Sequence, residues 1–223
     1  MIMADRDPEK DNLFKEIDEE LRHESYAKLW KRYGNYVIGA LVFAILIVAS
    51  YQGWEHYKQN KLGEDSALYE KALNALREEN NDEALSILTR LTKEGSKGYA
   101  TLSRLTHAGL IAKNGNKSDA NIAYLSVADD SNVNMVFRNL ALILSTMHNI
   151  DTGVYPETTE RIKNLTTTSN AWRHTAKELL ALIEQRNGNS GKANQLFQEL
   201  ADDVTAPASI RARASEMSTI SSK

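Results

Sequence analysis

The segment AGLIAKNGNKSDANIAYLSV, residues 108–127, contains a polar turn between two helical stretches. Its centre, Asn-Gly-Asn at 114–116, is typical of a helix that stops and is followed by another. An alanine lies on each side of this turn, Ala108 before it and Ala120 after it. Tyr124 follows Ala120 by four residues and therefore shares its helical face. The segment predicts two helices that meet at a pair of small residues.

The same arrangement recurs elsewhere in the chain, around the polar turns ENNDE (79–83) and RNGNSGK (186–192). Each turn lies between two alanines twelve residues apart, and a large apolar residue follows the second alanine by four positions. Small residues let two helix backbones approach closely, and the large residue fills the space beyond the crossing. The predicted packing residues are Ala72, Ala84, Ala108, Ala120, Ala181, Ala193, Leu88, Tyr124 and Phe197.

The spacing of this pattern predicts a helical repeat. The second alanines are 36 and then 73 residues apart, which is one period followed by two periods with one extra residue. A small-then-large alternation near this period is typical of the tetratricopeptide repeat, here in a degenerate form. A middle repeat is expected between 133 and 167, with an inserted loop, DTGVYP. The sequence does not determine which residues within 130–170 occupy which positions of the repeat. The segment APASIRARASEMSTI, 206–220, predicts a polar capping helix.

Residues 33–54 contain no charged side chain and are long enough to cross a bilayer as a helix. The aliphatic centre is flanked by rings on both sides, which is the placement expected at two membrane interfaces. The predicted interface residues are Trp30, Tyr33, Tyr36, Tyr51, Trp54 and Tyr57. A cleaved signal peptide and a buried core helix are the alternatives. A long acidic segment before the run argues against the first, and tryptophan and tyrosine rings confined to its ends argue against the second.

Basic residues near the apolar run predict its orientation, because Lys and Arg favour the cytoplasmic side. Four precede the run and two follow it, in the order Arg22, Lys28, Lys31, Arg32, Lys58 and Lys61. We expect a cytoplasmic arm at 1–32 that contains a short amphipathic helix, a transmembrane helix at 33–54, and a tetratricopeptide-like domain with its capping helix at 55–223. The predicted fold is thus all-α: one transmembrane helix followed by a helical-repeat solenoid.

The order and spacing of these parts resemble a known family. The segments that carry the resemblance are FKEIDEELRHESYAKLWKRYG (14–34), KGYATLSRLTHAGLIAKNGNKSDANIAYLSVADDSNVNMVFRNLALILS (97–145) and AWRHTAKELLALIEQRNGNSGKANQLFQELADDVTAPASIRARA (171–214). They are similar to the bacterial ancillary SecYEG translocon subunit family (YfgM-like), in its alphaproteobacterial type.

The resemblance implies an inner-membrane protein with a single span, whose N-terminus is cytoplasmic and whose repeat domain is periplasmic. It also implies three kinds of protein partner: the translocation channel, a membrane-anchored periplasmic chaperone of the prolyl-isomerase type, and newly secreted chains. The implied function is to assist the passage of those chains from channel to chaperones. No catalytic residue carries over from this family.

The residues themselves predict no enzyme activity. The chain has no cysteine, and its five histidines form no pair with metal-ligand spacing. No phosphate-binding loop or nucleophile elbow is found, and basic residues are interspersed with acids, unlike a nucleic-acid footprint. We therefore expect no cofactor, no metal and no nucleic-acid partner. The net charge of −3 provides no field that would attract a charged ligand.

Two classes of function fit this pattern. In the first, stacked helix pairs form a groove that binds a peptide or helix, and the candidate groove residues are Tyr69, Arg104, Trp172 and Lys177. An ordinary surface or packing role is the alternative for each of them. In the second, the repeats position another activity, as a scaffold in the assembly or regulation of a respiratory, haem-maturation or cell-wall complex.

Overall fold

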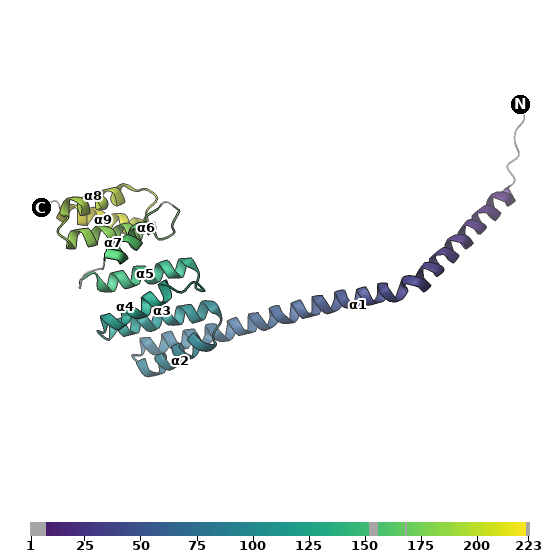
Figure 1. Cartoon of the computed structure of the whole chain (residues 1–223), viewed down its shortest axis with the longest axis horizontal. Helices are drawn as coiled ribbons and strands as arrows, with labels where there is room; N and C mark the ends of the chain where they lie inside the picture. Colours follow the sequence, from purple (N-terminus) through teal and green to yellow (C-terminus); the bar gives the residue numbers. More distant parts are fainter. Residues whose placement is uncertain (1–7, 152–155, 168, 222–223) are drawn as a thin grey trace, which may run out of the picture. The chain divides into compact units, whose positions relative to one another are not determined.

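The computed structural model describes residues 8–151, 156–167 and 169–221, with side chains from residue 30 onward. Within these ranges the chain forms nine helices and no strand (Figure 1). The helices are α1 (Pro8–Arg77), α2 (Asn81–Glu94), α3 (Lys97–Lys113), α4 (Lys117–Ala128), α5 (Met135–Asn149), α6 (Pro156–Leu165), α7 (Arg173–Arg186), α8 (Ser190–Asp202) and α9 (Ala208–Ser221). The all-helical prediction is thus confirmed for the described chain.

Helix α1 is much longer than the sequence pattern suggested, because one helix contains the arm, the apolar run and the first repeat helix. It begins at Pro8, a favourable first helical position, and the next proline in the sequence is Pro156. Its interior glycines, such as Gly39 and Gly53, weaken a helix by about 1 kcal/mol each without ending it. The separate short helix predicted for the arm is therefore part of α1. The side chains that define its amphipathic face lie outside the described residues.

The chain divides into two compact units, Met1–Asn60 and Lys61–Lys223. In the first unit, the segment of α1 from Trp30 is long and apolar enough to cross a membrane, with a window of mean hydropathy 1.9. None of that window is buried in the structure. The criterion is one of length and composition, and core helices of soluble proteins and signal sequences also meet it.

In the second unit, each helix from α2 onward packs against the next one in the chain. The last turns of α1, from Lys61 to Arg77, belong to this unit. One buried cluster extends from Leu105 on α3 to Leu180 on α7, and a second joins α7 and α8 to α9. Successive antiparallel pairs that share a core only with their neighbours are typical of a helical-repeat solenoid.

The three turns singled out in the sequence share one backbone geometry. A residue with positive φ ends the first helix of each pair: Glu79 (61°), Gly115 (86°) and Gly188 (81°). The N–H of the next residue, always an asparagine, donates to a carbonyl five positions earlier, as in Asn116 to Ile111 at 3.3 Å. This is the Schellman motif. The same asparagines, Asn80, Asn116 and Asn189, are the N-caps of α2, α4 and α8.

The middle repeat is formed by α5 and α6. Ile162 and Leu165 of α6 are buried and have the spacing of Leu88 and Leu91 on α2. Counting back four residues from Ile162 places half-buried Thr158 where α2 has Ala84. The inserted loop predicted before α6 falls mostly on residues 152–155, outside the described residues.

Helix α9 covers the end of the last pair. Its Ile210 and Ala214 are buried against Phe197 and Leu200 of α8. Its Arg213 also forms two hydrogen bonds of 2.8 Å to the carboxylate of Glu178 on α7. The remaining face carries mainly serine, threonine and charged residues, as expected of a cap that faces solvent.

Candidate functional site

The residues predicted to pack the repeats lie in the interior of the second unit. None of them is more than 2% exposed: Ala72, Ala84, Ala108, Ala120, Ala181, Ala193, Leu88, Tyr124 and Phe197. The ring of Tyr124 stacks on His148, with ring centres 5.6 Å apart and planes inclined by 10°. Its hydroxyl lies close to Gly109, where a side chain would contact it at 3.3 Å. The burial of these side chains agrees with a packing role at the helix crossings.

Tyr69, the first candidate groove residue, connects the end of α1 to α3. Its hydroxyl and the Thr106 hydroxyl are 2.8 Å apart, and the two share a hydrogen bond. Its ring packs against Tyr99 with centres 5.9 Å apart and an angle of 55° between the planes. Tyr69 is half-buried, so part of the residue remains accessible to solvent.

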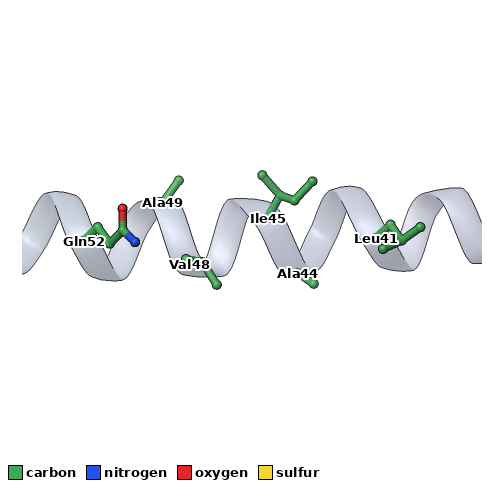
Figure 2. A pocket seen from close by; sticks show the side chains of 6 residues that line it. All are labelled: Leu41, Ala44, Ile45, Val48, Ala49 and Gln52. Carbon is green, nitrogen blue, oxygen red and sulfur yellow. The ribbon is translucent and has the colours of Figure 1, made fainter.

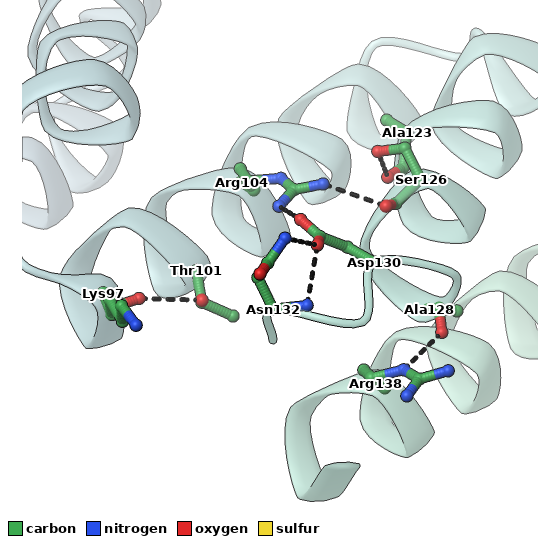
Figure 3. Close-up of polar contacts among 9 residues, drawn as sticks. All are labelled: Lys97, Thr101, Arg104, Ala123, Ser126, Ala128, Asp130, Asn132 and Arg138. Carbon is green, nitrogen blue, oxygen red and sulfur yellow. Dashed lines mark hydrogen bonds and ion pairs between the residues drawn. The ribbon is translucent and has the colours of Figure 1, made fainter. Parts of the chain in front are cut away.

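Arg104, the second candidate, is the centre of a polar network between α3 and the α4–α5 loop (Figure 3). Its guanidinium donates to the Asp130 carboxylate at 2.7 Å and to the Ser126 carbonyl at 2.9 Å. Asp130 also accepts from the backbone N–H of Asn132 at 3.0 Å. The hydrogen bond from Arg104 contributes most to lowering the pKa of Asp130 below its ordinary value. A partner that uses Arg104 must compete with these contacts.

Trp172 and Lys177, the remaining candidates, also bridge helices. The Trp172 indole N–H donates to the Val136 carbonyl of α5 at 3.0 Å. The Lys177 ammonium on α7 is 3.2 Å from the Glu199 carboxylate on α8. Both side chains are half-buried. All four candidates thus have structural partners within the chain, and a binding role for any of them stays a prediction.

The predicted interface residues all lie on α1, and each is largely exposed: Trp30, Tyr33, Tyr36, Tyr51, Trp54 and Tyr57. The Trp30 ring lies over Gly34, where an added Cβ would approach it to 3.2 Å. The apolar side chains between the two groups of Trp and Tyr rings are exposed as well, for example Phe43 at 66% and Ile45 at 65%. Six side chains of this one helix, drawn in Figure 2, line a shallow hollow: Leu41, Ala44, Ile45, Val48, Ala49 and Gln52.

Three ionisable side chains are buried in the structure although the sequence did not predict their burial. Asp65 of α1 accepts from the backbone N–H of Ser96 at 2.6 Å and is 3.3 Å from the Lys61 ammonium. Burial alone would raise the pKa of Asp65, but these hydrogen bonds lower it below its ordinary value. The Glu184 carboxylate accepts hydrogen bonds from Asn189, in the turn after α7, and from Lys192 on α8. The third group is His174, whose ring is close to Asp203. None of these residues stands in a recognisable motif.

No group of three or more metal-ligating side chains is brought together in the part of the chain with described side chains. The Asp129 carboxylate is paired with Arg161 at 2.7 Å, and Asp130 with Arg104. These ion pairs connect loops and helices of adjacent repeats. The described surface thus offers half-buried rings and charged groups, and their use by a polypeptide partner stays a prediction.

Comparison with known protein families agrees with this arrangement. The model of the tetratricopeptide repeat-like domain matches residues 27–211. The chain belongs to this family. The match includes the apolar segment of α1 as well as the helix pairs, and such repeat domains are typically non-enzymatic modules for protein–protein interaction. A search of curated proteins gave no match.

Proposed function

We propose that this tetratricopeptide repeat-like protein is a non-enzymatic adaptor, anchored in the bacterial inner membrane by α1. In this proposal it binds the protein-export translocon and periplasmic chaperones, and it assists the hand-over of newly secreted chains. The N-terminus is cytoplasmic and the repeat unit is periplasmic. The observation that carries the proposal is the exposed apolar segment of α1 in the same chain as the repeats.

The exposure of that segment supports a membrane location. Nine large aliphatic or aromatic side chains between Val37 and Val48 are each at least 44% exposed. Soluble monomers rarely expose a continuous apolar surface of this kind, because burying apolar area is worth about 25 cal/mol per Å². A bilayer satisfies these side chains, and the rings at both ends suit its interfaces.

The choice of partners is supported by the resemblance of residues 14–34, 97–145 and 171–214 to ancillary translocon subunits. A single span fits an adaptor of this kind, because it confines the repeat surface to the membrane and raises its effective concentration near membrane partners. The alternative is an anchored scaffold for a respiratory, haem-maturation or cell-wall complex, which the same anchor and repeats would also serve.

A mild-detergent pull-down of the tagged full-length protein tests this function. Residues 55–223, which include the whole second unit, serve as the matched control without the anchor. We expect the translocation channel and an anchored chaperone to be enriched with the full-length chain and reduced with the control. Recovery of a respiratory, haem-maturation or cell-wall complex in their place would contradict the proposed partners and support the scaffold.

A further inference from the structure

His174 lies at the junction between the last helix pair and the capping helix. It is in the first turn of α7 and is 8% exposed. Its Nδ1 is 3.4 Å from a carboxylate oxygen of Asp203, in the loop that leads to α9. Its Nε2 is buried and has no hydrogen-bond partner among the described residues. Among the described residues the ring thus has one short polar contact, through Nδ1, and its Nε2 has none.

The loop above this ring is fixed by several hydrogen bonds. Asp203 accepts from the backbone N–H of Thr205 at 2.9 Å and from its hydroxyl at 2.6 Å. The Arg173 guanidinium donates to the same hydroxyl at 3.2 Å. Ala206, at the end of this loop, is buried with Ile210 and Ala214 of α9. The position of α9 thus depends on a loop that rests on His174.

The charged groups around the ring come from three elements. Arg173 and Lys177 are its neighbours on α7, and Asp203 belongs to the α8–α9 loop. Glu199 of α8 forms an ion pair with Lys177. A proton added to the imidazole would place a third positive charge near Arg173 and Lys177, and Asp203 is the one described residue in position to accept a hydrogen bond from it. The second N–H, on Nε2, would be a buried donor without an acceptor among the described residues, and a buried donor left without an acceptor destabilises the docked arrangement.

We propose that protonation of His174 releases α9 from the end of the repeat unit and makes the C-terminal cap acid-sensitive. Movement of the α8–α9 loop would bring water to Nε2 and relieve the buried charge. It would also uncover the apolar surface that α9 covers, which includes Ala181, Phe197 and Leu200. The inference is independent of the anchor and of the partners proposed above.

The direction of the pH effect follows from the surroundings of the ring. Burial, Arg173 and Lys177 lower the pKa of His174 below its ordinary value of 6.5, and Asp203 opposes them. A histidine whose pKa is lower in the folded state binds its proton more readily when released. The contribution of the docked loop is therefore complete above pH 6.5, and it is lost as the pH falls toward the lower folded-state pKa.

Hydrogen exchange of the full-length protein in lipid nanodiscs tests the proposal, followed by mass spectrometry between about pH 7.5 and about pH 5. After correction for intrinsic exchange rates, we expect amides of α9 to exchange about tenfold faster at the lower pH, while those of α4 stay protected. Equal protection of α9 at both pH values would overturn the proposal.

Variants separate the histidine from a general effect of acid. His174→Gln stays neutral, so protection of α9 should become independent of pH, whereas His148→Gln on α5 should leave the response intact. Asp203→Asn retains an acceptor for Thr205 but removes the charge that favours the imidazolium, so the midpoint should move to lower pH. Should His174→Gln fail to fold, NMR titration of the wild-type ring decides. A His174 midpoint that differs from that of α9 exchange would overturn the proposal.

Discussion

At the scale of single residues, Glu79 is strained where its two counterparts are relaxed. Its φ of 61° lies in the left-handed region, which the equivalent Gly115 and Gly188 adopt without a Cβ penalty. We expect Glu79→Gly to stabilise the protein by about 0.5–1 kcal/mol, because the penalty of about 1–2 kcal/mol exceeds the entropic cost of glycine. Thermal unfolding of the full-length chain in detergent should show a melting temperature higher by about 2–4 °C.

The matched control for this substitution is Gly115→Ala, which introduces the same strain into the second turn. It should lower the melting temperature by a similar amount. A lower melting temperature for Glu79→Gly would mean that the Glu79 side chain makes a contribution larger than the strain.

Glu184 predicts a second, acid-dependent loss of stability in the last repeat. Its side chain is 8% exposed, and the hydrogen bond from Lys192 is the main cause that lowers its pKa below the ordinary 4.5. A carboxyl group with a lowered folded-state pKa stabilises the fold above its unfolded pKa and ceases to do so as the pH falls through the folded value. Urea unfolding should therefore show a free energy that decreases below about pH 4.5, with a smaller decrease in Glu184→Gln.

A useful comparison is Glu94, an exposed residue paired with Arg90 on α2. Glu94→Gln should leave the acid dependence almost unchanged, because exposed ion pairs contribute little to stability. Identical slopes for Glu184→Gln and the wild type would show that Lys192 and Asn189 do not bind the carboxylate in solution.

The spacing of residues such as Ala108, Ala120 and Tyr124 could be read from the sequence, because it reflects contacts between helices adjacent in the chain. Asp65 could not be recognised in the same way. Its partner, the N–H of Ser96, is 31 residues away, and α1 contains many other acids. The same limit applies to Arg104 and Trp172. The sequence predicted that Arg104 lies in a helix and that Trp172 lies near the start of one. It did not predict their hydrogen-bond partners, Asp130 and Val136, because these contacts depend on how the helices pack in three dimensions.

At the scale of elements, the crossing of α3 and α4 depends on a small residue at position 120. Ala120 is fully buried, and Tyr124 and Val127 occupy the space beyond it. Ala120→Leu should reduce the free energy of unfolding by about 1–3 kcal/mol, because extra methylene groups in a packed core force side chains and backbones apart. Urea denaturation followed by circular dichroism measures this change.

Ser118→Leu is the control, since Ser118 is exposed and lies two residues earlier on the same helix, on a different face. Its effect should stay within about 0.5 kcal/mol. An Ala120→Leu variant as stable as the wild type would contradict the assignment of this alanine to the crossing.

Element boundaries could be predicted where a helix terminator exists and not elsewhere. The Asn-Gly-Asn turns at 114–116 and 187–189 end α3 and α7 at the expected places. No such signal separates the arm, the apolar run and the first repeat helix, and the structure has one helix there. The register of α6 also stayed open, because Thr158 replaces the alanine on which the pattern depends.

At the scale of the whole molecule, the two units differ in whether their apolar side chains are buried or exposed. The second unit buries its apolar side chains in two clusters, while the first exposes them along α1. A bilayer around α1 and water around the repeats would satisfy both. If α1 spans a bilayer, the excess of Lys and Arg before the apolar run predicts that the N-terminus is on the cytoplasmic side and the repeat unit on the other side.

The absence of cysteine from the sequence allows this topology to be measured with single introduced thiols. Thr89→Cys places a thiol at an exposed position of α2, and Lys10→Cys places one before the apolar run. In cells with a permeabilised outer membrane, a membrane-impermeant maleimide should label Thr89→Cys at once. It should label Lys10→Cys only after the inner membrane is opened, because the bilayer then separates the two positions. The reverse pattern would show the opposite orientation in the membrane. Equal labelling of both thiols in a soluble fraction would contradict the proposal that α1 anchors the protein.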